Sequence, residues 1–256
     1  MVKKTLVIGA VLFGAWSCAT VPPSTPVFHI EDVPQAVAGR FNLDQRIAAD
    51  EAWADLKANR PIQAQKAIAR MGIGSSVYAA GLGYVHLLLG DTASAEHDFK
   101  EALRTSSDMT PACAGLAQIY ESRGDSEHAL AQYREILKTE PDNRWAKPRF
   151  ESLRNGLVDK LSEEAKAAQS AGNVEEAKKA YLRILFYDPQ SAQANIELAR
   201  IYEKEKNVRG ALRHLKSALE SQPKNKALLR EYADMLFDSG ELGPSLDAYE
   251  SLAELD

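Results

Sequence analysis

The sequence has few of the residues from which catalytic and metal sites are usually built. Two cysteines and five histidines occur in 256 residues, and no two histidines lie three or four positions apart, so no helix face carries a two-histidine metal site. It contains no glycine-rich phosphate loop and no serine elbow. Carboxylate pairs are common, but their polar surroundings give no reason for a raised pKa. We therefore expect no enzyme activity, metal or cofactor.

The chain also lacks a dominant basic patch. Its formal net charge is −5, and 26% of its residues are charged. Lysine, arginine, aspartate and glutamate are mixed along helix faces, which is typical of solvated surfaces. Because nucleic-acid binding needs a concentrated basic surface, we expect no nucleic-acid partner.

What the sequence does contain is a tandem repeat of fixed period. Gly90-Asp91 recurs as Gly124-Asp125, 34 positions later. Within one period, small and apolar residues follow helical spacing in two runs, and the Gly-Asp pair separates the runs. Glycine supplies the backbone angles that end a helix, and aspartate can cap the next one. The pattern predicts helix–turn–helix units stacked in tandem as a solenoid.

These positions resemble the tetratricopeptide repeat family. Unit 110–143 carries the family pattern in Leu116, Ala117, Tyr120, Gly124, Asp125, Ala129, Tyr133 and Pro141. The resemblance covers about residues 44–256 and implies an all-α superhelical solenoid of antiparallel helix pairs. The expected units are 44–75, which is degenerate and lacks the Gly-Asp turn, 76–109, 110–143, 158–191, 192–225 and 226–256.

Residues 144–157 interrupt the period as an insert between two units. Apolar residues run through the insert at steps of three and four, which favours one long helix over about 148–171. Pro148 would then lie in the first turn, where its missing N–H costs little. Asn155-Gly156 argues for the alternative, a break that leaves two separate helices.

Residues 1–17 have the features of a signal peptide. Lys3 and Lys4 precede the largely apolar run Thr5–Trp16, which is too short to span a bilayer as a helix. Cys18 follows directly, and this arrangement resembles a bacterial lipoprotein signal, in which the cysteine becomes the lipid-modified N-terminus. Residues 18–43 contain four prolines and are expected to form an extended tether between the lipid and the array.

The same resemblance implies a location. Ala19 is not the aspartate that retains such proteins at the inner membrane, so we expect an outer-membrane lipoprotein facing the periplasm. The alternative is a plain secretory signal, an incidental Cys18 and a secreted or periplasmic protein. With Cys18 lipidated, Cys113 is left without a disulfide partner and is expected to be a small buried hydrophobe.

The family resemblance also places a partner-binding groove on the first helix of each unit. Its N-terminal half would be apolar and its C-terminal half charged, so a protein segment could insert aliphatic side chains at one end and pair charges at the other. For Tyr84, Leu87 and Leu88, the alternative is that they pack against the preceding unit. The expected groove residues are Tyr84, Leu87, Leu88, Gln118, Glu121, Lys166, Gln169, Ile196, Arg200, Glu203, Lys204, Arg230, Asp234 and Phe237.

The expected function is a non-enzymatic protein–protein interaction scaffold, lipid-anchored in the bacterial envelope, that supports assembly of secretion, pilus, peptidoglycan or export machinery. The alternative is a regulatory or spacer portion of a longer envelope protein whose active domain lies beyond residue 256. The last unit stops without a polar capping helix. Tyr249, Leu252 and Leu255 are therefore expected to be partly exposed and available for self-association.

Overall fold

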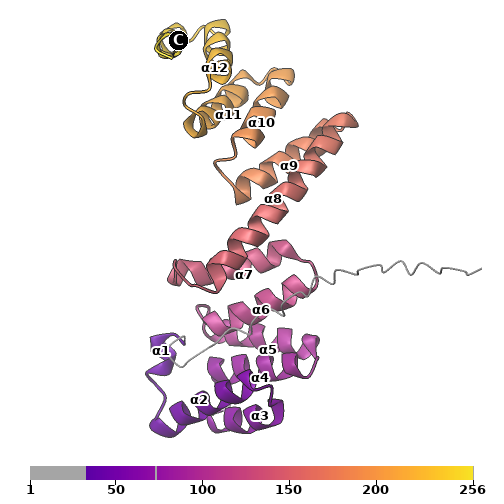
Figure 1. Ribbon diagram of the computed structural model, residues 1–256, viewed down its shortest axis with the longest axis vertical. Coiled ribbons are helices and arrows are strands. Elements are labelled where there is room, and N and C mark those ends of the chain that lie inside the picture. The colour runs from indigo at the N-terminus through magenta and orange to yellow at the C-terminus, as the bar shows by residue number, and fades with distance from the viewer. Residues whose placement is uncertain (1–32, 73, 256) are drawn as a thin grey trace, which may run out of the picture.

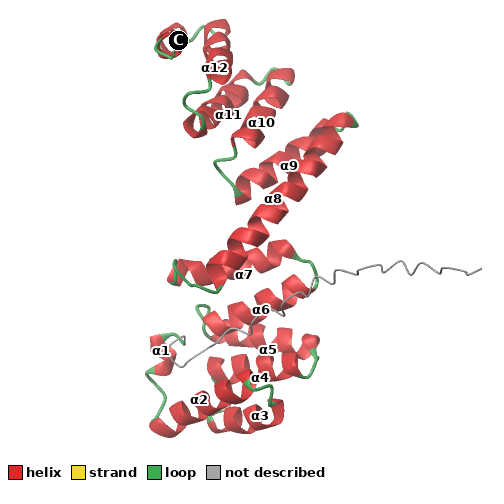
Figure 2. Cartoon of the chain, viewed as in Figure 1, coloured by secondary structure: helices red, strands yellow, loops and turns green. Residues whose placement is uncertain are grey.

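The structure is a computed structural model that describes residues 33–72 and 74–255. The expected signal peptide, Cys18 and most of the expected tether lie outside the described residues. Within them every regular element is an α-helix (Figure 2). The helices are α1 (Gln35–Ala38), α2 (Leu43–Lys57), α3 (Pro61–Arg70), α4 (Ser76–Leu88), α5 (Thr92–Thr105), α6 (Thr110–Ser122), α7 (Ser126–Thr139), α8 (Ala146–Ser170), α9 (Val174–Tyr187), α10 (Ala192–Lys204), α11 (Val208–Ser221), α12 (Lys226–Asp238) and α13 (Leu242–Ala253).

From α2 onward the helices form consecutive pairs in the order of the expected units, and α8 begins at Ala146, within the insert 144–157. The partners are α2 with α3, α4 with α5, α6 with α7, α8 with α9, α10 with α11, and α12 with α13. The pairs follow one another along the long axis of an elongated array (Figure 1). The expected all-α solenoid of helix pairs is confirmed, and it includes the degenerate unit.

The two Gly-Asp turns close the pairs α4 with α5 and α6 with α7, as the sequence predicts. Gly90 and Gly124 have φ angles of +79° and +71°, in the left-handed region that favours glycine. The side chain of Asp91 accepts a hydrogen bond from the backbone N–H of Ser94 at 3.0 Å, which caps α5. At the corresponding turn between α10 and α11, Lys206 adopts φ +59° without being glycine.

Small residues let the aromatic ring of Phe99 lie between two helices. Phe99, on α5, is fully buried, and its ring meets that of Tyr84 edge-on at a centroid distance of 4.9 Å. A Cβ atom at Gly83 on α4 would lie 2.5 Å from this ring, and one at Gly115 on α6 would lie 2.2 Å from it. Both positions must therefore remain glycine for the ring to fit.

The insert extends the first helix of its unit, so the long-helix expectation is confirmed. Helix α8 has 25 residues and runs through Asn155-Gly156 without a break. It crosses the array obliquely between α7 and α9 (Figure 1). One hydrophobic core covers the helices before it and reaches Ala146, and a second surrounds α8 to α10. The long helix is thus the place where one core gives way to the next.

The expectation of an extended tether up to residue 43 is wrong for its described part. Val33 is buried in the N-terminal core, and Val37 and Phe41 pack against that core. Arg46 at the start of α2 donates hydrogen bonds to the backbone carbonyls of Phe41 and Ala38, at 3.4 and 3.3 Å. Burial of these apolar side chains is favourable, and an extended tether would leave them exposed to water.

In the last helix pair, one of the three side chains expected to be partly exposed is buried instead. Leu252 is 6% exposed, because α13 turns this side chain toward α12 and packs it with Leu236. Tyr249, at 37%, and Leu255, which is partly buried, agree with the expectation. Leu242 and Leu246 of α13 are also exposed, at 61% and 59%. In the part of the chain that the structure describes, no helix is both long and apolar enough to cross a membrane.

Candidate functional site

A cavity of about 530 Å³ lies between α10 and α12. Val208, at the first position of α11, and Met235 on α12 contribute apolar surface to it, and Val208 is 40% exposed. Glu203, Arg230 and Asp234, three of the expected groove residues, line the same cavity. The structure therefore brings together part of the predicted C-terminal groove.

Local sequence determines which side chains of α12 reach this cavity. The Asn225 side chain accepts a hydrogen bond from the N–H of Leu228 at 3.1 Å, so α12 begins immediately after it. Helical spacing then places Leu229, Ala233 and Leu236 in the core against α11 and α13. Residues 230, 234 and 238 lie on the other side of the helix and line the cavity.

The cavity has an acidic rim. Four carboxylates line it, those of Glu203, Glu231, Asp234 and Asp238, against the single guanidinium of Arg230. Tyr249 on α13 donates a hydrogen bond from its hydroxyl to Asp234. That bond raises the pKa of Tyr249, because it is made by the protonated phenol. The hydroxyl also joins α13 to the cavity rim.

In the middle of the array, predicted groove residues are already engaged with their own chain. The Tyr181 hydroxyl donates to Oε1 of Gln169 at 2.8 Å, and the amide of Gln169 donates to Glu197 at 3.0 Å. Arg200 pairs with the same Glu197 at 2.9 Å. Burial raises the pKa of Tyr181 to about 12, so its hydroxyl remains a donor. These side chains connect α8, α9 and α10.

One unit earlier the same arrangement recurs. Glu121 on α6 accepts a hydrogen bond from the Tyr133 hydroxyl on α7. Tyr133 and Tyr181 each lie 12 residues after their acceptors, because both follow the same helix–turn–helix geometry. Burial is the main cause that raises the pKa of Tyr133.

Tyr84 is not a groove residue. It is 3% exposed, and its hydroxyl donates to the backbone carbonyl of Pro111 at 2.8 Å. Trp53 of the degenerate unit meets its ring edge-on at 6.1 Å, which is the packing alternative that the sequence left open. Leu87 and Leu88 are partly buried against the same core.

The remaining predicted groove residues do not converge on one site. Gln118 and Ile196 are partly buried, and Lys166 and Lys204 are exposed. Lys166 pairs with Glu163 at 3.0 Å on its own helix. Phe237 is 58% exposed on α12.

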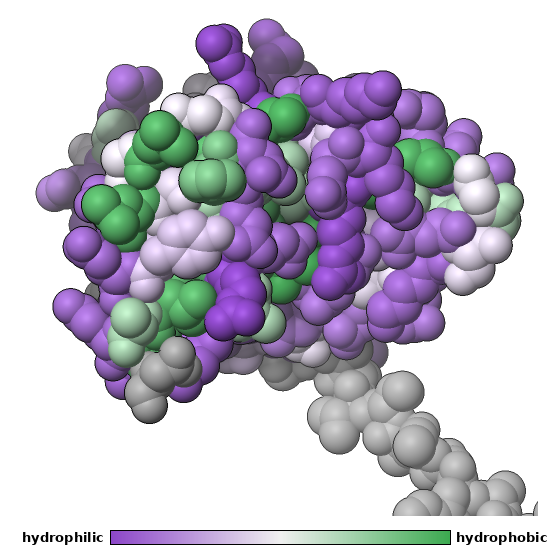
Figure 3. Space-filling view, turned by 90° about the horizontal axis from the view of Figure 1, so that it is seen from above, coloured by the Kyte–Doolittle hydropathy of each residue, from purple (hydrophilic) through white to green (hydrophobic). Residues whose placement is uncertain are grey.

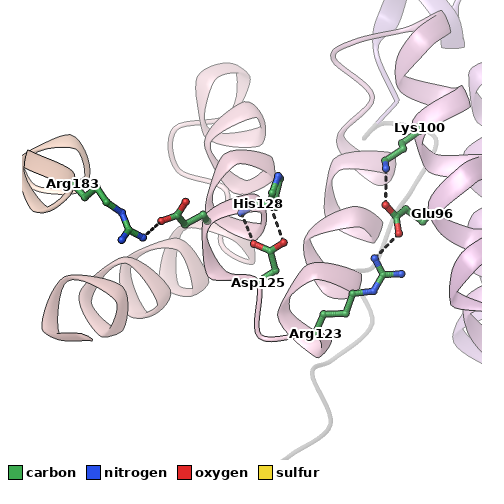
Figure 4. A network of polar contacts seen from close by, with 7 residues as sticks. Glu96, Lys100, Arg123, Asp125, His128 and Arg183 are labelled. Atoms are coloured by element: carbon green, nitrogen blue, oxygen red, sulfur yellow. Dashed lines mark hydrogen bonds and ion pairs between the residues drawn. The ribbon is translucent and has the colours of Figure 1, made fainter. Parts of the chain in front are cut away.

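A second cavity, of about 520 Å³, lies beside the long helix α8. Arg149 and Lys160 line it from α8, and Glu121 and Asp125 line it from the opposite side. Arg183 of α9 points toward α7 and pairs there with Glu127, as Figure 4 shows. Because both charge signs line this cavity and its carboxylates are already bonded, it favours no single class of ligand.

Figure 4 also shows how neighbouring helix pairs are joined near this cavity. Glu96 on α5 pairs with Lys100 at 2.6 Å and with Arg123, at the end of α6, at 2.5 Å. Asp125 accepts from both the backbone N–H and the ring of His128. The described residues contain no group of three or more histidine, cysteine, aspartate or glutamate side chains placed to hold a metal ion.

Sequence reasoning missed several residues of the first cavity, namely Val208, Glu231 and Asp238. Val208 belongs to the second helix of its unit, where the family resemblance places no groove residue. A charge pattern could have drawn attention to the others, because no lysine, arginine or histidine follows Arg230.

Comparison with known proteins supports the repeat assignment. One tetratricopeptide repeat model matches residues 86–147 and 168–228, and a second matches 204–256, so the two cover more than half of the chain. No curated protein matches the sequence significantly.

Among solved structures, the chain is similar to the TPR domain of P58(IPK), with 18% identity and a TM-score of 0.38, over 82% of this chain and 60% of that one. It is also similar to the TPR2AB domain of yeast Sti1 in complex with pHSP90, with 14% identity and a TM-score of 0.38, over 83% and 90% of the two chains. A third is PilF of Pseudomonas aeruginosa, with 19% identity and a TM-score of 0.34, over 71% and 76%. At these scores the likeness does not extend beyond stacked helix pairs.

Proposed function

Because the chain belongs to the tetratricopeptide repeat family, we propose that it is a non-enzymatic scaffold that binds a segment of another protein in the cavity between α10 and α12. The observation that carries this proposal is the exposed apolar surface of Val208 inside a cavity rimmed by charged side chains. Interfaces of this kind bury an apolar centre and pair charges at the rim. Two adjacent helix pairs hold the cavity open, so little ordering is needed on binding.

Photo-crosslinking in intact cells tests this proposal. A photoreactive amino acid is placed at Val208 and, in a separate variant, at Lys179, which is exposed on α9 away from the cavity. We expect discrete protein adducts from position 208 that are absent from position 179. Equal adducts from both positions, or none from either, would contradict the proposal.

We further propose that the scaffold is anchored by a lipid on Cys18 and faces the periplasm from the outer membrane. The support is the apolar run before Cys18 and the alanine that follows it. Such a scaffold would hold proteins of an envelope assembly such as a secretion, pilus, peptidoglycan or export machine. The alternative, a spacer within a longer envelope protein, places the activity beyond residue 256.

Cell fractionation tests the anchor. Cys18→Ala should move the protein from the membrane fraction to the soluble fraction and abolish labelling by a fatty-acid analogue. Cys113→Ala is the matched control. Because Cys113 is buried within the array, its replacement should change neither the fractionation nor the lipid labelling. Unchanged lipid labelling of the Cys18→Ala protein would contradict the proposed lipid anchor and favour the plain secretory alternative.

A further inference from the structure

Negative charge is concentrated in the last helix pair. Residues 231–256 contain eight aspartates and glutamates and no lysine, arginine or histidine, whereas the whole chain has a net charge of only −5. The rest of the array is therefore slightly positive. Four of the carboxylates around this end line the cavity between α10 and α12. A surface with one sign of charge attracts partners of the opposite sign and repels those of its own.

Exposed apolar side chains accompany that charge. Leu242, Leu246 and Tyr249 follow one another on one face of α13, and Phe237 is 58% exposed on α12. Viewed from above, the end of the array that carries α13 shows apolar side chains gathered among hydrophilic ones (Figure 3). The bond from Tyr249 to Asp234 connects this face to the cavity rim. Apolar surface gathered within a polar surround marks an interaction site.

We propose that α12, α13 and the cavity beside them form a docking surface for a positively charged, amphipathic segment of a partner protein. Its lysine or arginine side chains face Glu203, Asp234 and Asp238, and its apolar side chains cover Val208 and Tyr249. This inference rests on the proposed scaffold function and adds the chemistry of the partner.

The negative charge of the surface favours a basic protein segment over a second copy of the chain or a lipid bilayer. A second copy docked face to face through α13 would bring Asp247 and Glu250 of each chain toward the same groups of the other, which costs energy. A bilayer with anionic headgroups would be repelled by the same carboxylates. A basic segment alone gains from both the apolar and the acidic parts of the surface.

Calorimetry with synthetic peptides tests the inference on the full chain. The first peptide, of about 14 residues or roughly four helical turns, carries lysines and leucines on opposite faces. A second has glutamate in place of every lysine, and a third has serine in place of every leucine. We expect only the first to bind with a one-to-one stoichiometry. Its affinity should fall as the salt concentration rises from about 20 to about 300 mM, because salt screens exposed charges.

Two double variants locate the binding. Glu203→Gln with Asp238→Asn removes two cavity carboxylates that make no side-chain hydrogen bond or ion pair with another described residue. We expect it to weaken binding of the lysine–leucine peptide by about five-fold, since exposed charge pairs each contribute modestly. Glu151→Gln with Glu220→Gln makes the same charge change away from the cavity and should leave the affinity unaltered.

The possible failures are distinguishable. Equal weakening by both double variants, or equal binding of the glutamate–leucine peptide, would overturn the basic-partner inference and leave the scaffold function intact. Absence of binding by every peptide, together with absence of crosslinks from Val208, would overturn both. Self-association of the full chain in sedimentation, abolished by Leu246→Glu, would assign the surface to a second copy and overturn the inference.

Discussion

Replacement of Gly115 by alanine tests whether the close helix crossing around Phe99 limits the stability of the array. The added Cβ would lie 2.2 Å from the nearest ring atom of Phe99, far inside van der Waals contact. The ring cannot retreat, because on its other side the Cα of Gly83 already leaves no room for a Cβ. Overpacking of a core at a fixed site costs about 1–3 kcal/mol, and this site belongs at the upper end of that range.

An opposing term reduces the net effect. Alanine is favoured over glycine in a helix interior by about 1 kcal/mol, so Gly115→Ala should lower the free energy of unfolding by about 2 kcal/mol. Gly156→Ala is the matched control, because a Cβ there meets no heavy atom within 4 Å. This variant should raise the free energy of unfolding by about 0.5–1 kcal/mol.

Urea denaturation followed by far-ultraviolet circular dichroism measures both changes. Repeat arrays can unfold in parts and not all at once. The slope of the unfolding free energy against urea concentration must therefore be equal in all the proteins compared, since a changed slope would show that the mode of unfolding had changed. Phe99→Leu in the Gly115→Ala background should recover part of the loss, since a smaller side chain relieves the overlap. A Gly115→Ala protein as stable as the Gly156→Ala protein would refute the packing argument.

Three further predictions follow from other parts of the structure. Lys206→Gly should raise the free energy of unfolding by about 1 kcal/mol in the same urea assay, because Lys206 has a φ angle of +59° that glycine adopts without strain; no gain would contradict this. Burial raises the pKa of Cys113 to about 12, so in the Cys18→Ala protein a thiol-reactive dye should label this cysteine in urea but not in buffer, and fast labelling in buffer would show that the site opens. Burial also lowers the pKa of His214, whose Nδ1 lies 2.8 Å from Oδ1 of Asn195. The unfolded chain then binds the proton more readily, so stability should fall as the pH drops through about 6.5, and His214→Gln should show a smaller fall over that window.

Much of the fold could be predicted from sequence because the forces that specify it are local. The Gly-Asp turns, the helical spacing of apolar residues and the phase of those residues through the insert all act within one or two helices. They were sufficient to predict the helix pairs and the long α8, including its passage through Asn155-Gly156. The degenerate unit also forms a helix pair, although it lacks the Gly-Asp turn. Packing of its apolar faces stabilises the two helices without that turn.

The site could be predicted only in part, because it depends on contacts between pairs. The family resemblance identified Glu203, Arg230 and Asp234 but assigned Tyr84 to the groove, and the structure buries that ring between Trp53 and Phe99.

The sequence alone thus determined which segments are helices, where each turns and how the pairs succeed one another, since backbone conformation and capping are decided among neighbouring residues. Tertiary structure alone decided which inward-facing side chains remain available. Glu121, Gln169 and Asp234 accept hydrogen bonds from tyrosines of the next helix. Val208, Glu203 and Asp238 remain exposed around the cavity between α10 and α12. The physical reason is that exposure depends on the distances between helices, and no spacing within the sequence specifies those distances.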